Sequence, residues 1–219
     1  MKLVDFRQVA AYFKGLPHQQ AAFEYLEQNC PDEIREKFTE IWRKPLQGSK
    51  ILDYVPQPDV VTCQSAAIAK VLGRTDVMQI RKDLLQMGTP GDPKVMSRYL
   101  LLRCAYYSFT DKGSLSEAVE FLKKPNRAII THGWFTRSGH VVTLAANHPQ
   151  GFIVDDSWGD FDFEAWRYIS DDGNNRTWAF AQVYAAVVAS IGFEHAKNIY
   201  AARDVDMDYK NAWFHLIEN

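Results

Sequence analysis

The stretch PQPDVVTCQSAAIAKVLG, residues 56–73, leads from a proline-flanked turn into an alanine-rich apolar segment that ends in glycine. Its composition and the final Gly73 predict a helix over 60–73. Cys63 lies near the start of this helix, where unpaired backbone N–H groups and the positive end of the helix dipole favour thiolate over thiol. The alternative is a structural cysteine, because a free cysteine usually packs as a small hydrophobe.

The rest of the chain is predicted to form helices first and strands later. Helices are predicted over 76–87, 96–102 and 115–122, a short strand over 103–109, strands over 128–134, 141–144 and 152–154, a further helix over 178–191 and a final strand over 212–217. The segment HPQG, residues 148–151, has the composition of a hairpin turn. This order predicts an α+β domain with an antiparallel sheet.

A linker divides the chain into two parts. Residues 1–46 have apolar residues at helical spacing and predict an N-terminal helical segment. The sequence KPLQGS, residues 44–49, is typical of a linker. Residues 47–219 are long enough to form one globular domain with a sizeable core.

Composition argues against several classes of function. The 219 residues carry a formal net charge of −2, which disfavours nucleic acid as a partner because phosphate binding requires a basic surface. Three widely spaced cysteines form neither a disulfide framework nor a zinc motif, so a reducing compartment of synthesis is expected. The charged N-terminus is unlike a signal peptide, and no apolar run has the length of a membrane span. We therefore expect synthesis in the cytoplasm and no membrane span.

Three other polar residues suit the chemistry of a cysteine nucleophile. Gln57 lies six positions before Cys63, and its side-chain amide can donate a hydrogen bond to an oxyanion. His140 is at the entry of a predicted strand, where a neutral imidazole can take the thiol proton. Asp156 ends the next strand, and antiparallel pairing can bring its carboxylate beside the imidazole to fix the ring. Asp155 then points to the opposite face of the sheet, because side chains alternate along a strand.

A metal site and an aromatic groove are two further hypotheses. His132, His140 and Asp156 have the composition of a two-histidine, one-carboxylate ligand set, but no HExxH spacing accompanies them. We therefore expect neither a metal nor another cofactor. Trp134 and Trp158 lie beside the histidine and aspartate segments and are candidates for the walls of a substrate groove, although tryptophan more often packs in a core.

Three segments together resemble the signature blocks of papain-fold peptidases related to the bacteriocin-processing, double-glycine leader peptidases. They are VPQPDVVTCQSAA (55–67), HGWFTRSGHVVTL (132–144) and GFIVDDSWG (151–159), within a resemblance that covers about residues 51–160. The resemblance implies a papain-like fold, in which a helical subdomain carries the cysteine and an antiparallel sheet carries the histidine and the aspartate.

The same resemblance assigns roles to the candidate residues. It implies that Cys63 is the nucleophile, Gln57 the oxyanion donor, His140 the general base and Asp156 the residue that orients the base. The residue after Asp156 is serine, where many members of the family have proline. This departure leaves Asp155 as the alternative orienting residue.

A second resemblance concerns the N-terminal segment. The GLPHQ stretch, residues 15–19, is similar to segments of bacteriophage cell-wall hydrolases. It implies an endolysin-type cysteine peptidase or amidase that cleaves amide bonds in bacterial peptidoglycan after release from the cytoplasm. Two alternatives stay open, namely a peptidase that processes a protein or leader peptide, and a non-catalytic binding module with the same fold. Residues 1–46 are accordingly expected to bind the wall, to cover the catalytic core or to act as a prosegment.

Overall fold

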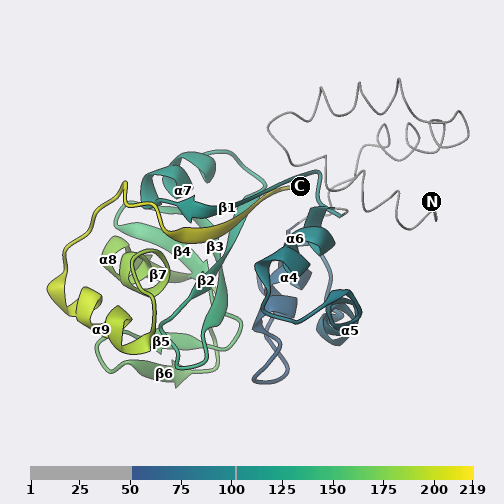
Figure 1. The fold of residues 1–219 in the computed structure, drawn as a ribbon, viewed down its shortest axis with the longest axis horizontal. Helices are drawn as coiled ribbons and strands as arrows, with labels where there is room; N and C mark the ends of the chain where they lie inside the picture. The colour runs from purple at the N-terminus through teal and green to yellow at the C-terminus, as the bar shows by residue number, and fades with distance from the viewer. Residues whose placement is uncertain (1–50, 102) are drawn as a thin grey trace, which may run out of the picture.

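One antiparallel sheet lies between two groups of helices in the part of the chain that the computed structural model describes, residues 51–219 without Leu102 (Figure 1). The strand order is β1-β8-β2-β3-β4-β7, and every neighbouring pair is antiparallel. The strands are β1 (Tyr106–Gly113), β2 (Arg127–Gly133), β3 (His140–His148), β4 (Gly151–Asp155), β7 (Arg176–Ala179) and β8 (Ala212–Glu218). A separate two-stranded sheet consists of β5 (Asp160–Asp162) and β6 (Arg167–Ser170). The α+β fold class is therefore confirmed, whereas the predicted helical segment 1–46 lies outside the described residues.

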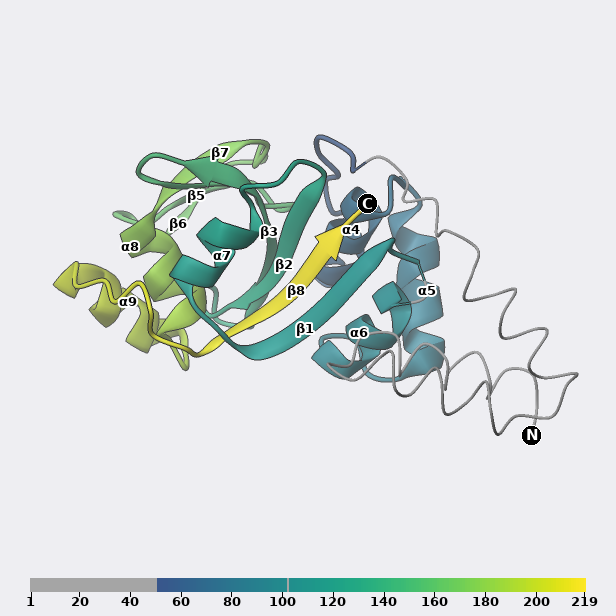
Figure 2. The same ribbon diagram turned by 90° about the horizontal axis from the view of Figure 1, so that it is seen from above.

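Helices cover both faces of the large sheet (Figures 1 and 2). One face carries α4 (Cys63–Val71), α5 (Val77–Met87) and α6 (Pro93–Leu101). The other carries α7 (Leu115–Phe121), the α8 turn (Phe180–Val183), the π-helix η1 (Tyr184–Val188) and α9 (Phe193–Ala202). Because successive side chains of a strand point to opposite faces, Ile129 and Ile130 of β2 belong to two different cores. None of the helices in residues 51–101 and 103–219 combines the length and the apolar character that crossing a membrane requires.

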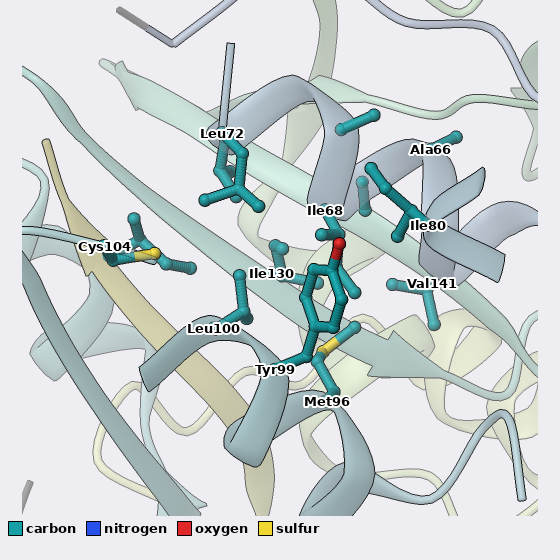
Figure 3. Packing of buried hydrophobic residues seen from close by; sticks show 14 of the residues in the cluster. Ala66, Ile68, Leu72, Ile80, Met96, Tyr99, Leu100, Cys104, Ile130 and Val141 are labelled. Carbon is teal, nitrogen blue, oxygen red and sulfur yellow. The ribbon is translucent and has the colours of Figure 1, made fainter. Parts of the chain in front are cut away.

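The alanine-rich helix α4 is the central element of the first core (Figure 3). Every residue from 64 to 71 is buried, as expected for a helix that is covered on all sides. Small side chains such as Ala66 let the helix lie close to the sheet, where Ile68 shares a core with Ile130 and Val141. This packing fixes the N-terminal end of α4, and with it Cys63, beside the start of β3.

A buried ion pair fastens α4 to the end of β4. Lys70 Nζ lies 2.6 Å from Asp155 Oδ2, and the two side chains are only 5% and 3% exposed. The same ammonium group donates hydrogen bonds to the backbone carbonyls of Leu52 (2.9 Å) and Asp53 (2.6 Å). Asp155 also accepts a hydrogen bond from the backbone N–H of Asn175 (2.7 Å). The ion pair therefore joins the segment before α4, the helix itself and the edge of the sheet.

The predicted elements differ from the structure mainly in the C-terminal third. The expected helix over 178–191 is wrong at its start, because Trp178 belongs to β7 and pairs with Phe152 of β4. Strands β5, β6 and β7 have three or four residues each, too few for an alternating pattern to stand out. The sequence does not predict α9, whose buried residues are only Ala196 and Tyr200.

Lys70→Met is expected to lower the free energy of unfolding by about 3–5 kcal/mol, because it leaves the Asp155 carboxylate buried without its counter-ion. Urea denaturation at neutral pH measures this change. The double variant Lys70→Met/Asp155→Leu is the control and should recover much of the loss, since it leaves no unpaired charge. A single variant as stable as the wild type would contradict this role of the ion pair.

Candidate active site

Cys63 is the first residue of α4, and its thiol lies next to His140. The sulfur accepts hydrogen bonds from the imidazole of His140 and from the backbone N–H groups of Val141 and Gln64. Gln64 belongs to the first turn of α4, whose N–H groups have no acceptor within the helix. Val141 follows His140 in β3. The thiol is thus held at the junction of α4 and β3, and its side chain is partly exposed.

His140 begins β3, and its ring connects the thiol to Asp156. Nε2 of the ring lies 2.7 Å from Asp156 Oδ1, so the hydrogen bond to Cys63 comes from the other nitrogen, Nδ1. The ring of Phe135 packs edge-on against the imidazole, with the ring centroids 5.5 Å apart. Gly139, with φ of +75°, makes the turn into β3 in a conformation that favours glycine. Turn, strand and ring packing together fix the imidazole between its two partners.

The carboxylate of Asp156 is fully buried and has a donor on each oxygen. Oδ1 accepts hydrogen bonds from His140 and from the backbone N–H of Trp158 (2.9 Å). Oδ2 accepts one from the hydroxyl of Tyr168 (2.9 Å). The backbone carbonyl of Asp156 accepts a further bond from the hydroxyl of Tyr54 (3.0 Å). The three contacts at Oδ1 and Oδ2 hold the carboxylate in one orientation toward the imidazole.

The two adjacent carboxylates point in opposite directions, as strand alternation predicts. Asp156 faces His140, whereas Asp155 faces Lys70 on the α4 side of the sheet. The structure therefore brings Cys63, His140 and Asp156 together and leaves Asp155 out of this group.

Ionisation of the thiol and of the imidazole is coupled. Burial raises the pKa of the Cys63 thiol, but the hydrogen bond and charge of His140, with two backbone N–H groups, lower it by more, so the pKa lies below its ordinary value. Burial lowers the pKa of His140, but the charge and hydrogen bond of Asp156, together with Cys63, raise it to about 10. The lowered pKa of Cys63 and the raised pKa of His140 both favour a thiolate–imidazolium pair. The thiolate is the nucleophilic form of cysteine.

Gln57 lies in the turn before α4, and its side-chain amide is fixed at both ends. Its Oε1 accepts a hydrogen bond from Ser157 Oγ (2.7 Å), and its Nε2 donates one to the carbonyl of Asp59 (2.7 Å). The backbone N–H of Gln57 also donates to the carbonyl of Ser157 (2.9 Å). Within residues 51–219, apart from Leu102, the second N–H of the amide has no acceptor. It is therefore available to an oxygen atom of a ligand.

Trp134 and Trp158 border the site and are 44% and 38% exposed. Trp158 follows the Asp156 turn, and its ring lies edge-on to that of Tyr168. The backbone N–H of Trp134 donates to the carbonyl of Ala186 in η1 (2.8 Å), which fixes the loop that leads to β3. Neither indole is buried in a core, so both are available for contact with a ligand.

Three residues that organise the site are missed by the sequence interpretation: Tyr168, Ser157 and Lys70. Tyr168 lies in a strand too short to predict. Ser157 stands out in the sequence only as a departure from the family pattern. Lys70 does carry a signal, because a charged side chain in an apolar helix indicates a buried partner.

His132 does not join the group around Cys63. It pairs with Val141, so it faces the opposite side of the sheet from His140, and its Nε2 lies 3.1 Å from Nε2 of His215. In the described part of the chain, no three His, Cys, Asp or Glu side chains are placed to hold a metal ion. The alternative ligand set of His132, His140 and Asp156 is therefore not assembled.

A directional chain of hydrogen bonds determines which ring nitrogen of His132 and of His215 carries the proton. Ser97 donates to the carbonyl of Pro93 (2.8 Å), so Tyr107 donates to Ser97 (2.7 Å). His215 Nδ1 must then donate to Tyr107 (2.6 Å), and its Nε2 accepts from His132. Burial lowers the pKa of His132 to about 4. Burial and the nearby His132 lower the pKa of His215 well below its ordinary value, so both rings are neutral at pH 7.

Comparison of the chain with protein-family models, with curated proteins and with solved structures gave no match. The contacts described above and the sequence motifs therefore carry the functional proposal.

Iodoacetamide is expected to label Cys63 much faster than the buried Cys104 at neutral pH, because reactivity follows the thiolate fraction and access. Peptide mapping by mass spectrometry identifies the labelled residue. His140→Ala is expected to slow the labelling of Cys63 at pH 6 roughly tenfold, since the imidazole lowers the thiol pKa. Equal labelling rates in the wild type and in His140→Ala would show that the imidazole does not activate the thiol.

The free energy of unfolding is expected to decrease as the pH falls from about 6.5 to about 4. The folded-state pKa values of His132 and His215 lie below that of an unfolded histidine, so the unfolded chain binds more protons in this window. Above pH ~6.5 both rings are neutral in either state and contribute no further change.

His132→Asn tests this pH dependence because it removes one of the two histidines. It should reduce the slope of the unfolding free energy against pH by up to about 1.4 kcal/mol per pH unit. Urea denaturation at several pH values between 7 and 4.5 measures the slope. A slope that is the same in both proteins would argue against the neutral histidine pair.

Proposed function

We propose that this chain is a papain-like cysteine hydrolase that cleaves amide bonds. The observation that supports it most is the series of contacts from Cys63 through His140 to Asp156. It combines a thiol of lowered pKa, a group that can transfer a proton, and a buried carboxylate that orients this group. The position of the thiol on a helix and of the imidazole on an antiparallel strand agrees with the fold that the sequence motifs imply.

In the proposed reaction the thiolate of Cys63 attacks the carbonyl carbon of a bound amide. The backbone N–H of Cys63 at the start of α4 and the unused N–H of Gln57 donate to the oxyanion that forms. His140 gives its Nδ1 proton to the leaving amine as the C–N bond breaks, and an acyl thioester remains on Cys63. A water molecule that loses its proton to His140 then attacks the thioester, releases the carboxylic acid and restores the thiolate–imidazolium pair.

As substrate we propose bacterial peptidoglycan, cleaved in the manner of a phage endolysin. The GLPHQ stretch supports this choice, although residues 15–19 lie outside the described residues. The exposed rings of Trp134 and Trp158 beside the site offer apolar contact area for a stem peptide. The net charge of −2 gives no long-range attraction to an anionic wall, so binding would depend on specific contacts.

Purified protein is expected to clear bacterial sacculi that have been stripped of outer membrane. New amino groups should appear, because an amide bond is broken, and new reducing sugar ends should not. Cys63→Ala should lose nearly all of this release, whereas the matched control Cys30→Ala should keep it. Chemical assays of amino groups and of reducing ends measure the two products.

The other outcomes of this experiment separate the alternatives. Reducing ends without new amines would indicate a glycosidase and would contradict the proposal. Cleavage of a protein or leader peptide by an enzyme that leaves sacculi intact would favour a processing peptidase. Binding to sacculi without release of either product would favour a non-catalytic module.

A further inference from the structure

A bulge in the short β5–β6 sheet directs one side chain into the candidate site. Asp160 pairs with Ser170, and the register then shifts so that Phe161 pairs with Tyr168. In a regular antiparallel ladder Ile169 would lie opposite Phe161, because each step forward on one strand is one step backward on its partner. Instead Ile169 is 58% exposed, and the ring of Tyr168 packs against that of Phe161 with centroids 5.0 Å apart. The bulge thus places the phenol of Tyr168, in place of the aliphatic side chain of Ile169, on the side of the small sheet that faces Phe161 and the candidate site.

The phenol of Tyr168 ends at the carboxylate of Asp156. Its hydroxyl donates a hydrogen bond to Oδ2 at 2.9 Å. Within the described residues, no other group donates to this oxygen. The other two donors, from His140 and from the backbone of Trp158, both use Oδ1. Because the carboxylate has no exposed surface, solvent does not replace a missing donor on Oδ2.

The ring of Tyr168 is held on several sides, so the hydroxyl has little freedom to leave. It lies edge-on to the imidazole of His140 (centroids 6.3 Å apart) and to the indole of Trp158 (6.4 Å). Burial, the charge and hydrogen bond of Asp156 and the charge of Cys63 raise the pKa of Tyr168 far above its ordinary value. The phenol therefore stays protonated and keeps the proton that it donates to the carboxylate.

We propose that Tyr168 is a positioning residue: by holding Oδ2 of Asp156 it keeps Oδ1 directed at Nε2 of His140. Its catalytic meaning rests on the proposed function, but the orientation of His140 can be measured without any substrate. The ionisable groups that face the Cys63–His140 pair are Asp156, Tyr168 and, from the segment before α4, Tyr54.

Proton NMR of the full chain provides the first test. A buried, hydrogen-bonded imidazolium N–H gives a resolved downfield signal, and its absence in His140→Ala assigns it to this ring. Tyr168→Phe keeps the ring and removes only the hydroxyl, so the signal is expected to disappear or to broaden by exchange. Tyr54→Phe is the matched control, because Tyr54 bonds the backbone carbonyl of the same Asp156 and should leave the signal unchanged. An unchanged signal in Tyr168→Phe, or equal loss in Tyr54→Phe, would overturn the inference.

The pH profile of iodoacetamide labelling at Cys63 gives a second readout, which does not depend on the NMR signal. Tyr168→Phe is expected to narrow the pH range over which Cys63 is a thiolate and His140 an imidazolium by roughly one pH unit. The reason is that a carboxylate held less firmly stabilises the imidazolium less. Tyr54→Phe should leave this range unchanged. A range in Tyr168→Phe that is unchanged or wider would show that the hydroxyl does not position the carboxylate, and would overturn the inference.

Circular dichroism shows whether the variants fold. If Tyr168→Phe does not fold, 3-fluorotyrosine at position 168 preserves the shape and makes the hydroxyl a stronger donor. It is expected to move the His140 N–H signal, and an unmoved signal would overturn the inference. The wild-type protein could leave sacculi intact while Tyr168→Phe still changes the NMR signal and the labelling profile as described. That result would refute the proposed substrate and support the positioning role.

Discussion

A carboxylate without exposed surface has to find its hydrogen-bond donors inside the protein, and the arrangement around Asp156 follows from this requirement. Its donors come from β3, from the turn after β4 and from β6, so three separate segments must meet at one side chain. The segment before α4 is drawn to the same point, because Tyr54 binds the backbone carbonyl of Asp156. Cys63 is then placed by α4, and His140 joins the thiol to the carboxylate.

The neighbouring carboxylate of Asp155 is buried on the other face of the sheet, where a cation balances its charge. Asp155 is neutralised by Lys70 of α4, so one dipeptide both fastens the helix to the sheet and orients the imidazole. The register of β4 therefore matters for fold and site together. A slip of one residue would exchange the two faces, placing each carboxylate among the partners of the other.

The parts of this arrangement that the sequence predicts are those that depend on local patterns. The helix that carries Cys63, the strand that begins at His140, the strand that ends just before Asp156, and the opposite directions of Asp155 and Asp156 all follow from composition and alternation. The α+β class follows from the order of the elements.

The parts that the sequence does not predict depend on contacts between distant or irregular segments. Tyr168 reaches Asp156 through a bulge, which interrupts the alternation on which strand prediction relies. Ser157 and Gln57 are 100 positions apart, and nothing in either segment indicates their hydrogen bond. In the sequence His132 is a candidate metal ligand together with His140 and Asp156, but the strand order places it beside β8, where His215 is its partner.

The distance along the chain between the two sides of the site affects when the thiol becomes reactive. Tyr54 and Asp156, which touch in the folded protein, are separated by 102 positions, and Cys63 lies close to the earlier of the two. During synthesis the helix that carries Cys63 leaves the ribosome well before His140 and Asp156 do. Until the sheet has formed, the thiol lacks the imidazole that lowers its pKa and ionises like an ordinary cysteine. The lowered pKa of the Cys63 thiol is therefore a property of the completed fold, and an incomplete chain carries an ordinary cysteine at this position.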